Sequence, residues 1–276
     1  MNRHAIKHSL LALGWLALVT LTCAATNNAA HIYPSGAPIV IAIGNDLYST
    51  LDPRFQKGLN PKTIAIKKLT APVIALSQEN HGGVLCQVTI SQGFIDLLNH
   101  IAHAKAIDEI QPGYFTQYVS TLAQESANQN PPAPANLDDP RFWTDAVMSE
   151  QASLFNQMVS MTLAMNLSHY YLAHYAKYAA QIPDGRRQPI NNFIAADEWE
   201  ASVRCATLNS LDCALATQGA KALFDFIDQM PRRPAWASYI VPPNVNIKKL
   251  NHELFRYEHD YFHGGSSMHD RVAFGG

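Results

Sequence analysis

Residues 151–176 have the sequence QASLFNQMVSMTLAMNLSHYYLAHYA, without a single Asp, Glu, Lys or Arg. Apolar residues occupy every side of a helical wheel here, which is typical of a helix buried in the middle of a core. Polar residues nevertheless recur along it, and they argue against a membrane span. Buried polar groups need partners, so the pattern predicts either a core helix with a satisfied network or the wall of a site. These polar residues are Asn156, Gln157, Asn166, Ser168, His169 and His174.

The start of the chain has the pattern of a signal peptide. Arg3 and Lys7 precede an apolar run that begins at Leu10, and small residues follow it. We expect residues 1–25 to be a signal peptide and residues 26–276 to form a single domain, exported to a periplasm or secreted.

Two alternatives concern this same N-terminal segment. It could stay as an uncleaved anchor, although the apolar run is short for a bilayer, or Cys23 could carry a lipid. We expect no other membrane contact. The formal net charge is −2 and no basic run appears, which argues against a nucleic-acid partner.

Export implies an oxidising compartment, in which disulfides form. Cys205 and Cys213 flank the segment ATLNSLD, which we interpret as a turn between two helices, and a disulfide between them is predicted. Cys86 lies in an apolar run and is expected to be a buried, unreactive thiol.

The remaining pattern predicts a small sheet and several helices. Strand-like runs cover 63–67, 73–76 and 84–90, with a hairpin signal at Asn80–Gly83. Residues 108–147 contain a stretch rich in Pro and Asn and are interpreted as an insertion, either a surface loop or a lid. We therefore predict an α+β fold, mostly helical, in which a small antiparallel sheet packs on a central buried helix. The expected helices cover 94–107, 151–178, 197–207, 214–230 and 247–262.

Three segments in this order resemble the HtpX-like and CAAX-prenyl-protease-type zinc peptidases, the small gluzincins. The segment CQVTISQGFIDLLNHIA (86–102) is similar to the strand and helix that begin the family domain. The segment MNLSHYYLAH (165–174) has the frame of the family's HExxHxxxxH helix, and EWEAS (198–202) matches its later ExxAD-like segment. The resemblance covers roughly 84–210 without the insertion, and it implies a gluzincin-like domain.

In that family two histidines and the later glutamate hold Zn²⁺, and the glutamate after the first histidine is the general base. Here His169 and Glu198 occupy ligand positions, but Met165 replaces the first histidine, Asn166 replaces the base and Ser202 replaces the final aspartate. Methionine is a poor Zn²⁺ ligand beside histidine and carboxylate, and asparagine cannot take a proton from water. We expect no cofactor, or zinc if the site is retained.

Each of these residues also has an ordinary structural interpretation. His169 fits a hydrogen-bonded core histidine, and Glu198 fits a first-turn carboxylate that favours the helix dipole. His174 lies about 140° around a continuous helix from His169, so the two are not expected to share a metal. Tyr170, Tyr171 and Tyr175 fit packing aromatics, and His252, His259 and His263 fit a solvated helix face.

Three functions remain open. The first is an inactive pseudopeptidase that binds a polypeptide by strand addition beside strand 84–90. The second is an active zinc-dependent peptidase that uses His169, Glu198 and a third ligand, for which the candidates are His81, His100 and His103. The third is an unrelated helical exported binding protein, for which Glu198 should lie far from His169, whereas the first two hypotheses bring these side chains to face each other.

Overall fold

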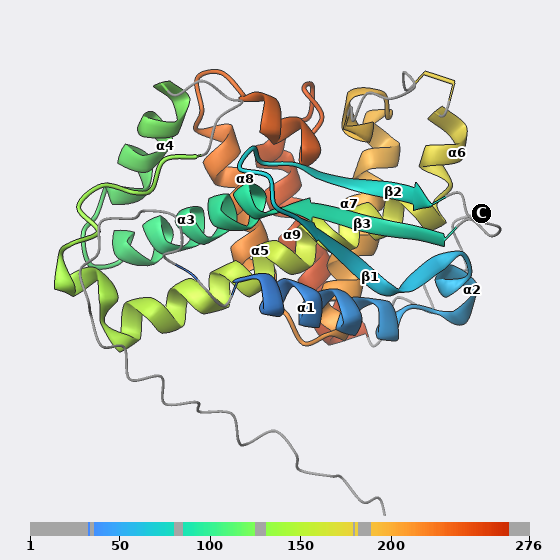
Figure 1. The fold of residues 1–276 in the computed structure, drawn as a ribbon, viewed down its shortest axis with the longest axis horizontal. Helices are drawn as coiled ribbons and strands as arrows, with labels where there is room; N and C mark the ends of the chain where they lie inside the picture. The colour runs from blue at the N-terminus through green and yellow to red at the C-terminus, as the bar shows by residue number, and fades with distance from the viewer. Residues whose placement is uncertain are drawn as a thin grey trace, which may run out of the picture. The chain divides into compact units, whose positions relative to one another are not determined.

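The computed structural model describes residues 33, 36–79, 85–124, 131–178, 180–181 and 189–264. Residues Tyr33–Gly276 form one compact unit, and the expected signal peptide lies outside the described residues. Helices dominate the described chain, with a small sheet, which confirms an α+β fold (Figure 1). The longer helices are α1 (Gly36–Thr50), α3 (Gln92–Asp108), α4 (Tyr114–Gln124), α5 (Asp145–Tyr171), α7 (Ala196–Asp212), α8 (Gln218–Asp228) and α9 (Ile247–Gly264). The short ones are α2 (Pro53–Gln56), α6 (His174–Tyr178), η1 (Pro140–Trp143), η2 (Ile190–Asn192) and η3 (Ala235–Tyr239).

The sheet has three strands, β1 (Leu59–Lys67), β2 (Ile74–Glu79) and β3 (Leu85–Ser91), in the order β1-β3-β2. β2 and β3 pair antiparallel, as the hairpin signal predicts, although the hairpin turn itself lies outside the described residues. β1 pairs parallel with β3, so the prediction of a purely antiparallel sheet is wrong. The hydrophobic pattern of a single strand does not specify whether that strand pairs parallel or antiparallel with its neighbour.

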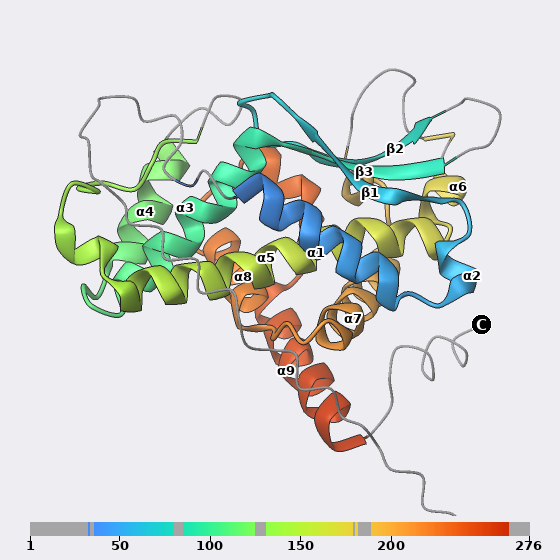
Figure 2. The same ribbon diagram turned by 60° about the horizontal axis from the view of Figure 1, so that its bottom comes forward.

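α5 is the central helix, and α1, α3, α7 and α8 pack around it. The sheet covers another side of α5, with α1 lying along β1 (Figures 1 and 2). Most of the buried polar residues of α5 have partners: Ser160 donates to Ser210, and the Gln157 amide oxygen accepts from the Gly219 N–H at 2.7 Å. α5 is therefore a core helix with a largely satisfied polar network.

The predicted helix 151–178 is divided in two. α5 ends at Tyr171, and Ala173 adopts a left-handed backbone with φ of 59° before α6 begins. His174 therefore belongs to α6 rather than to the central helix. This break follows from tertiary packing, because no glycine marks the helix end in the sequence.

The N-terminal part of the domain is more helical than its sequence suggests. The apolar run Ile39–Ile43 lies inside α1, and the turn residues of 44–60 lie largely in α1, in α2 and in the segments beside α2. Val40, Ile43 and Leu47 recur at helical spacing and are buried in the core.

The predicted insertion 108–147 contributes α4, η1 and the first residues of α5. Its buried side chains, among them Tyr118, Leu122 and Phe142, belong to the main core, and α4 packs on α3 and α8. Its described residues are thus part of the packed domain.

The predicted disulfide between Cys205 and Cys213 is wrong. Cys205 lies inside α7 and Cys213 directly follows its last residue, so about 12 Å of helix rise separates them. The intervening ATLNSLD segment is helical, because Ala206, Leu208 and Leu211 pack into the core.

The last helix, α9, packs on α7 and α8 through Leu250 and Leu254, and its second half extends beyond them (Figure 2). His252, His259 and His263 are exposed on it, as predicted for a solvated face. Within the described ranges, no helix combines the length and apolar character required to cross a membrane.

Candidate functional site

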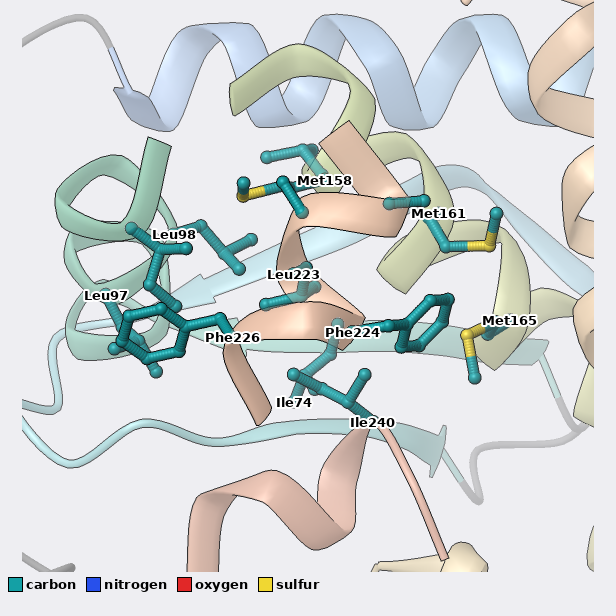
Figure 3. Close-up of a cluster of buried hydrophobic side chains, with 14 of the residues drawn as sticks. Ile74, Leu97, Leu98, Met158, Met161, Met165, Leu223, Phe224, Phe226 and Ile240 are labelled. Atoms are coloured by element: carbon teal, nitrogen blue, oxygen red, sulfur yellow. The ribbon is translucent and has the colours of Figure 1, made fainter. Parts of the chain in front are cut away.

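Met165, which the sequence resemblance aligns with the first zinc ligand, is part of the apolar core. Its side chain is 2% exposed. Figure 3 draws it in the same buried cluster as Ile74 of β2, Phe224 of α8 and Ile240. The Trp199 indole donates to the Ile240 carbonyl at 3.2 Å and ties that segment to α7. Met165 is therefore a packing residue with no access to a substrate.

Asn166, at the general-base position, is bound to its own helix. Its side chain is 5% exposed, and its Nδ2 donates to the Thr162 carbonyl at 2.9 Å. An amide has no basic group at neutral pH. The position cannot activate a water molecule.

His169 lies where α5 meets α7 and is 1% exposed. Its Nδ1 is 3.0 Å from His174 Nδ1 and 3.0 Å from Ser202 Oγ. Burial, with a smaller contribution from His174, lowers the pKa of His169 to about 3, although the Asn191 amide opposes this. The ring is neutral at physiological pH.

The two histidine rings meet because α6 begins a new helix after Tyr171. The placement of His174 about 140° around one continuous helix from His169 is therefore wrong, because α5 ends before His174 and the two rings come into contact. One Nδ1 of the pair must donate and the other accept. If His174 donates, His169 carries its proton on Nε2. This nitrogen and the Asn191 Oδ1 are both buried without a hydrogen bond of normal geometry, and the Asn191 side chain raises the pKa of the His169 ring. We assign this arrangement because it makes the His169 Nε2 a donor and the Asn191 Oδ1 its acceptor.

Glu198, the remaining ligand position, is engaged elsewhere. Lys177 Nζ and the Tyr178 hydroxyl donate to its two carboxylate oxygens, each at 2.5 Å. The Lys177 bond, followed by the Tyr178 bond, lowers the pKa of Glu198. Glu198 lies in the first turn of α7, one turn before Ser202, so the α7 face that carries it also reaches His169.

These residues do not fit Zn²⁺. Among the residues that the structure describes, no group of three or more His, Cys, Asp or Glu side chains could hold a metal ion. The alternative with a third histidine fails for His100 and His103, and His81 lies outside the described residues. His103 uses both ring nitrogens, with the Tyr33 hydroxyl at 2.6 Å and the Phe142 carbonyl at 2.8 Å.

The strand expected to accept a polypeptide is already paired on both sides. β3 lies between β1 and β2, so strand addition beside it is excluded and that prediction is wrong. The edges of the sheet belong to β1 and β2. At the outer edge of β2, the Leu76 N–H donates to the Tyr175 hydroxyl at 3.4 Å, a long hydrogen bond.

A cavity of about 390 Å³ lies beside the turn between α5 and α6. Aromatic side chains that the sequence interpretation assigned to packing line it together with residues of α2. No signal in the sequence connects α2 with this turn, because the two meet only through the tertiary fold. The lining residues are Arg54, Phe55, Lys57, Tyr170, Tyr171, Ala173, Tyr175 and Ala176.

Comparison with known proteins identifies no relative: no family model, no curated protein and no solved structure matches the chain.

Proposed function

We propose that this protein is an exported, catalytically inactive pseudopeptidase with a gluzincin-like domain, and that it binds polypeptide segments. The outer edge of β2 carries the proposal, because it offers a polypeptide backbone the hydrogen-bonding groups that it needs. Export is inferred from the N-terminal sequence pattern alone.

The loss of catalysis rests on the chemistry of the substituted positions. Met165 is enclosed in the core and Asn166 donates to its own helix, so neither contributes a ligand or a base. His169 and Glu198 are bound to other partners. A hydrolytic site of the family type would require other side chains at positions 165 and 166, as well as release of His169 and Glu198 from their present partners.

The gluzincin-like origin is supported by the way α5 and α7 face each other. The Ser168 hydroxyl donates to the Ser202 carbonyl at 3.2 Å, and the Ser202 hydroxyl lies 3.0 Å from His169. Ser202 occupies the slot of the family aspartate. Glu198 itself does not face His169, because its carboxylate oxygens accept from Lys177 and Tyr178, so the support comes from the Ser202 contacts alone.

The orientation of the β2 backbone favours strand addition. Val73 bonds towards Ser91 at the end of β3 through both its carbonyl and its N–H. Ile74 is 1% exposed, so an added strand would reach this edge from Leu76 onwards. Because backbone groups of alternate residues point to opposite edges of a strand, those of Ile74, Leu76 and Gln78 point away from β3. Within the described residues, their one hydrogen-bond partner at this edge is the Tyr175 hydroxyl.

The test compares two substitutions at Leu76. Leu76→Pro removes the outward N–H, whereas Leu76→Ala loses the same apolar packing but keeps the N–H. The probe is fluorescently labelled, reduced and carboxymethylated lactalbumin, which cannot fold, and binding is followed by fluorescence anisotropy. We expect binding by the wild type and by Leu76→Ala, and at least roughly tenfold weaker binding by Leu76→Pro.

Tyr175→Phe provides a second check, in which the affinity for the probe should change in the opposite direction to that of Leu76→Pro. It frees the Leu76 N–H from its present partner, so the affinity for the probe should rise. Equal affinity of the proline and alanine variants, with both folded by circular dichroism, would show that the β2 edge takes no part. Absence of binding by the wild type would overturn the proposal.

A further inference from the structure

The cavity beside the α5–α6 turn has a size suited to a small group. Its volume of about 390 Å³ falls in the range of about 300–1,000 Å³ typical of ligand pockets. Four aromatic side chains contribute to its lining, and two of the other lining residues are basic. None of its lining residues is acidic.

The walls of the cavity are held in place by direct contacts. The Tyr171 ring stacks on Phe55, with centroids 4.6 Å apart and an angle of 26° between the planes. The Tyr170 hydroxyl donates to the Lys57 carbonyl at 3.0 Å, which joins α5 to the end of α2. An aromatic or branched apolar group entering the cavity would therefore meet a preformed surface.

The charges at the rim favour an anion. Arg54 is paired with Asp52 through two hydrogen bonds, at 3.0 and 3.1 Å. Lys57 is exposed, and the described residues give its ammonium group no ion pair. Burial is the largest cause that raises the pKa of both Tyr170 and Tyr175, so these walls stay neutral. The lining of the cavity thus combines four aromatic residues with one lysine, Lys57, whose ammonium group has no ion pair recorded among the described residues.

The backbone at the rim is strained. Ala173, which lines the cavity, has φ of 59°, a conformation that costs an L-residue with a Cβ roughly 1–2 kcal/mol. Non-glycine residues in this conformation often occur at functional positions. The strain is independent of the charge and of the aromatic lining.

We propose that this cavity binds a carboxylate attached to an apolar group, with the Lys57 ammonium pairing with the carboxylate and the Phe55 and Tyr171 rings contacting the apolar part. The inference deepens the proposed polypeptide binding and rests on it for the source of the carboxylate. A polypeptide offers this chemistry in two ways, at an apolar C-terminal residue or at an acidic side chain beside an apolar one.

The test measures binding by isothermal titration calorimetry with three acetylated peptides. Ac-Gly-Ala-Leu-Phe has a free carboxylate, its amide has none, and Ac-Gly-Glu-Phe-Gly amide has an internal one. We expect one or both carboxylate peptides to bind at least roughly tenfold more tightly than the uncharged amide. Whichever carboxylate peptide binds more tightly identifies the source.

Two lysine variants assign the effect to the cavity. Lys57→Gln should weaken binding of the carboxylate peptides roughly tenfold and leave the uncharged amide unchanged. Lys68→Gln, a control at another exposed lysine outside the cavity, should change neither. Equal binding of all three peptides to the wild type, or no effect of Lys57→Gln, would overturn the inference.

A small probe separates this inference from the proposed function. The anion 3-phenylpropanoate carries the same chemistry without a peptide. If it binds and Lys57→Gln weakens it while no polypeptide binds, the cavity is correct and the proposed function fails. If unfolded lactalbumin binds through β2 while no carboxylate is selected, the proposed function stands and the cavity inference fails.

Discussion

Two alanines end helices in a conformation that usually requires glycine. Ala173 follows α5 and Ala214 follows α7, each with φ of 59° and each exposed. The Leu215 N–H bonds back to the Ser210 carbonyl, as in a Schellman motif. Because glycine has no Cβ, it takes this conformation without the steric cost that alanine pays.

We predict that Ala173→Gly and Ala214→Gly each stabilise the protein by about 1 kcal/mol. The steric strain that glycine relieves at φ of 59° is larger than the free-energy cost of the extra conformational entropy that glycine gives the unfolded chain. Urea unfolding followed by circular dichroism measures the change. Ala216→Gly serves as a control in an exposed position for which no positive φ is recorded, and it should not stabilise. A loss of stability in both variants would contradict the interpretation of the two helix ends.

At the level of single residues, the sequence predicts chemistry better than contacts. The side-chain chemistry of Met165 and Asn166 alone predicts that neither is a zinc ligand or a base, and the structure adds that both are buried. The contact between His169 and His174 could not be predicted, because it depends on the break at Ala173. Alanine is a strong helix former, so nothing in its identity indicates that the helix ends there.

The contact between α8 and α5 depends on one small residue. A Cβ at Gly219 would lie 2.5 Å from the Leu154 carbonyl oxygen and 2.7 Å from the Gln157 Cβ. The backbone of α5 cannot move without disturbing the core around it. Gly219 therefore sets how closely the two helices approach.

Gly219→Ala should destabilise the protein by about 1–3 kcal/mol, the typical cost of overpacking, despite the higher helix propensity of alanine. Chemical unfolding measures it against Gln218→Ala, the exposed neighbouring position, which should change stability little. Equal stability of the two variants would mean that α8 shifts freely on α5.

At the scale of helices and strands, the sequence predicts correctly the elements that a long apolar pattern defines. The central helix, the β2–β3 pairing and the helix after β3 all follow from such patterns. The parallel addition of β1 and the continuity of α7 through ATLNSLD do not, because distant packing partners decide both. The function proposed for β3 failed for this reason, since strand order is a property of the whole sheet.

Among the residues that the structure describes, histidines are buried in two separate places: His100 and His103 on α3, and His169 and His174 where α5 ends and α6 begins. Burial lowers the pKa of His100 to about 4 and of His169 to about 3, and it also lowers those of His103 and His174. In the unfolded chain these groups titrate near 6.5. Below that pH the unfolded state binds protons that the folded state does not.

The free energy of unfolding should therefore fall as the pH falls from 6.5 towards 4, with each buried histidine contributing up to about 1.4 kcal/mol per pH unit. Unfolding by urea at a series of pH values measures the slope. His100→Phe keeps an aromatic ring beside Tyr33 and Tyr118, and it should remove the contribution of one histidine to the slope of unfolding free energy against pH. An identical slope in His100→Phe and in His252→Gln, an exposed control, would refute this assignment.

The central claim is that this protein, which we propose to bind polypeptides, does not cut them. Intact mass spectrometry of reduced, carboxymethylated lactalbumin measures this directly, after incubation with the zinc-supplemented wild type and with His169→Ala. The account predicts an uncut polypeptide in both samples, because Met165 and Asn166 provide neither ligand nor base. Cleavage by the wild type that disappears in His169→Ala would contradict it.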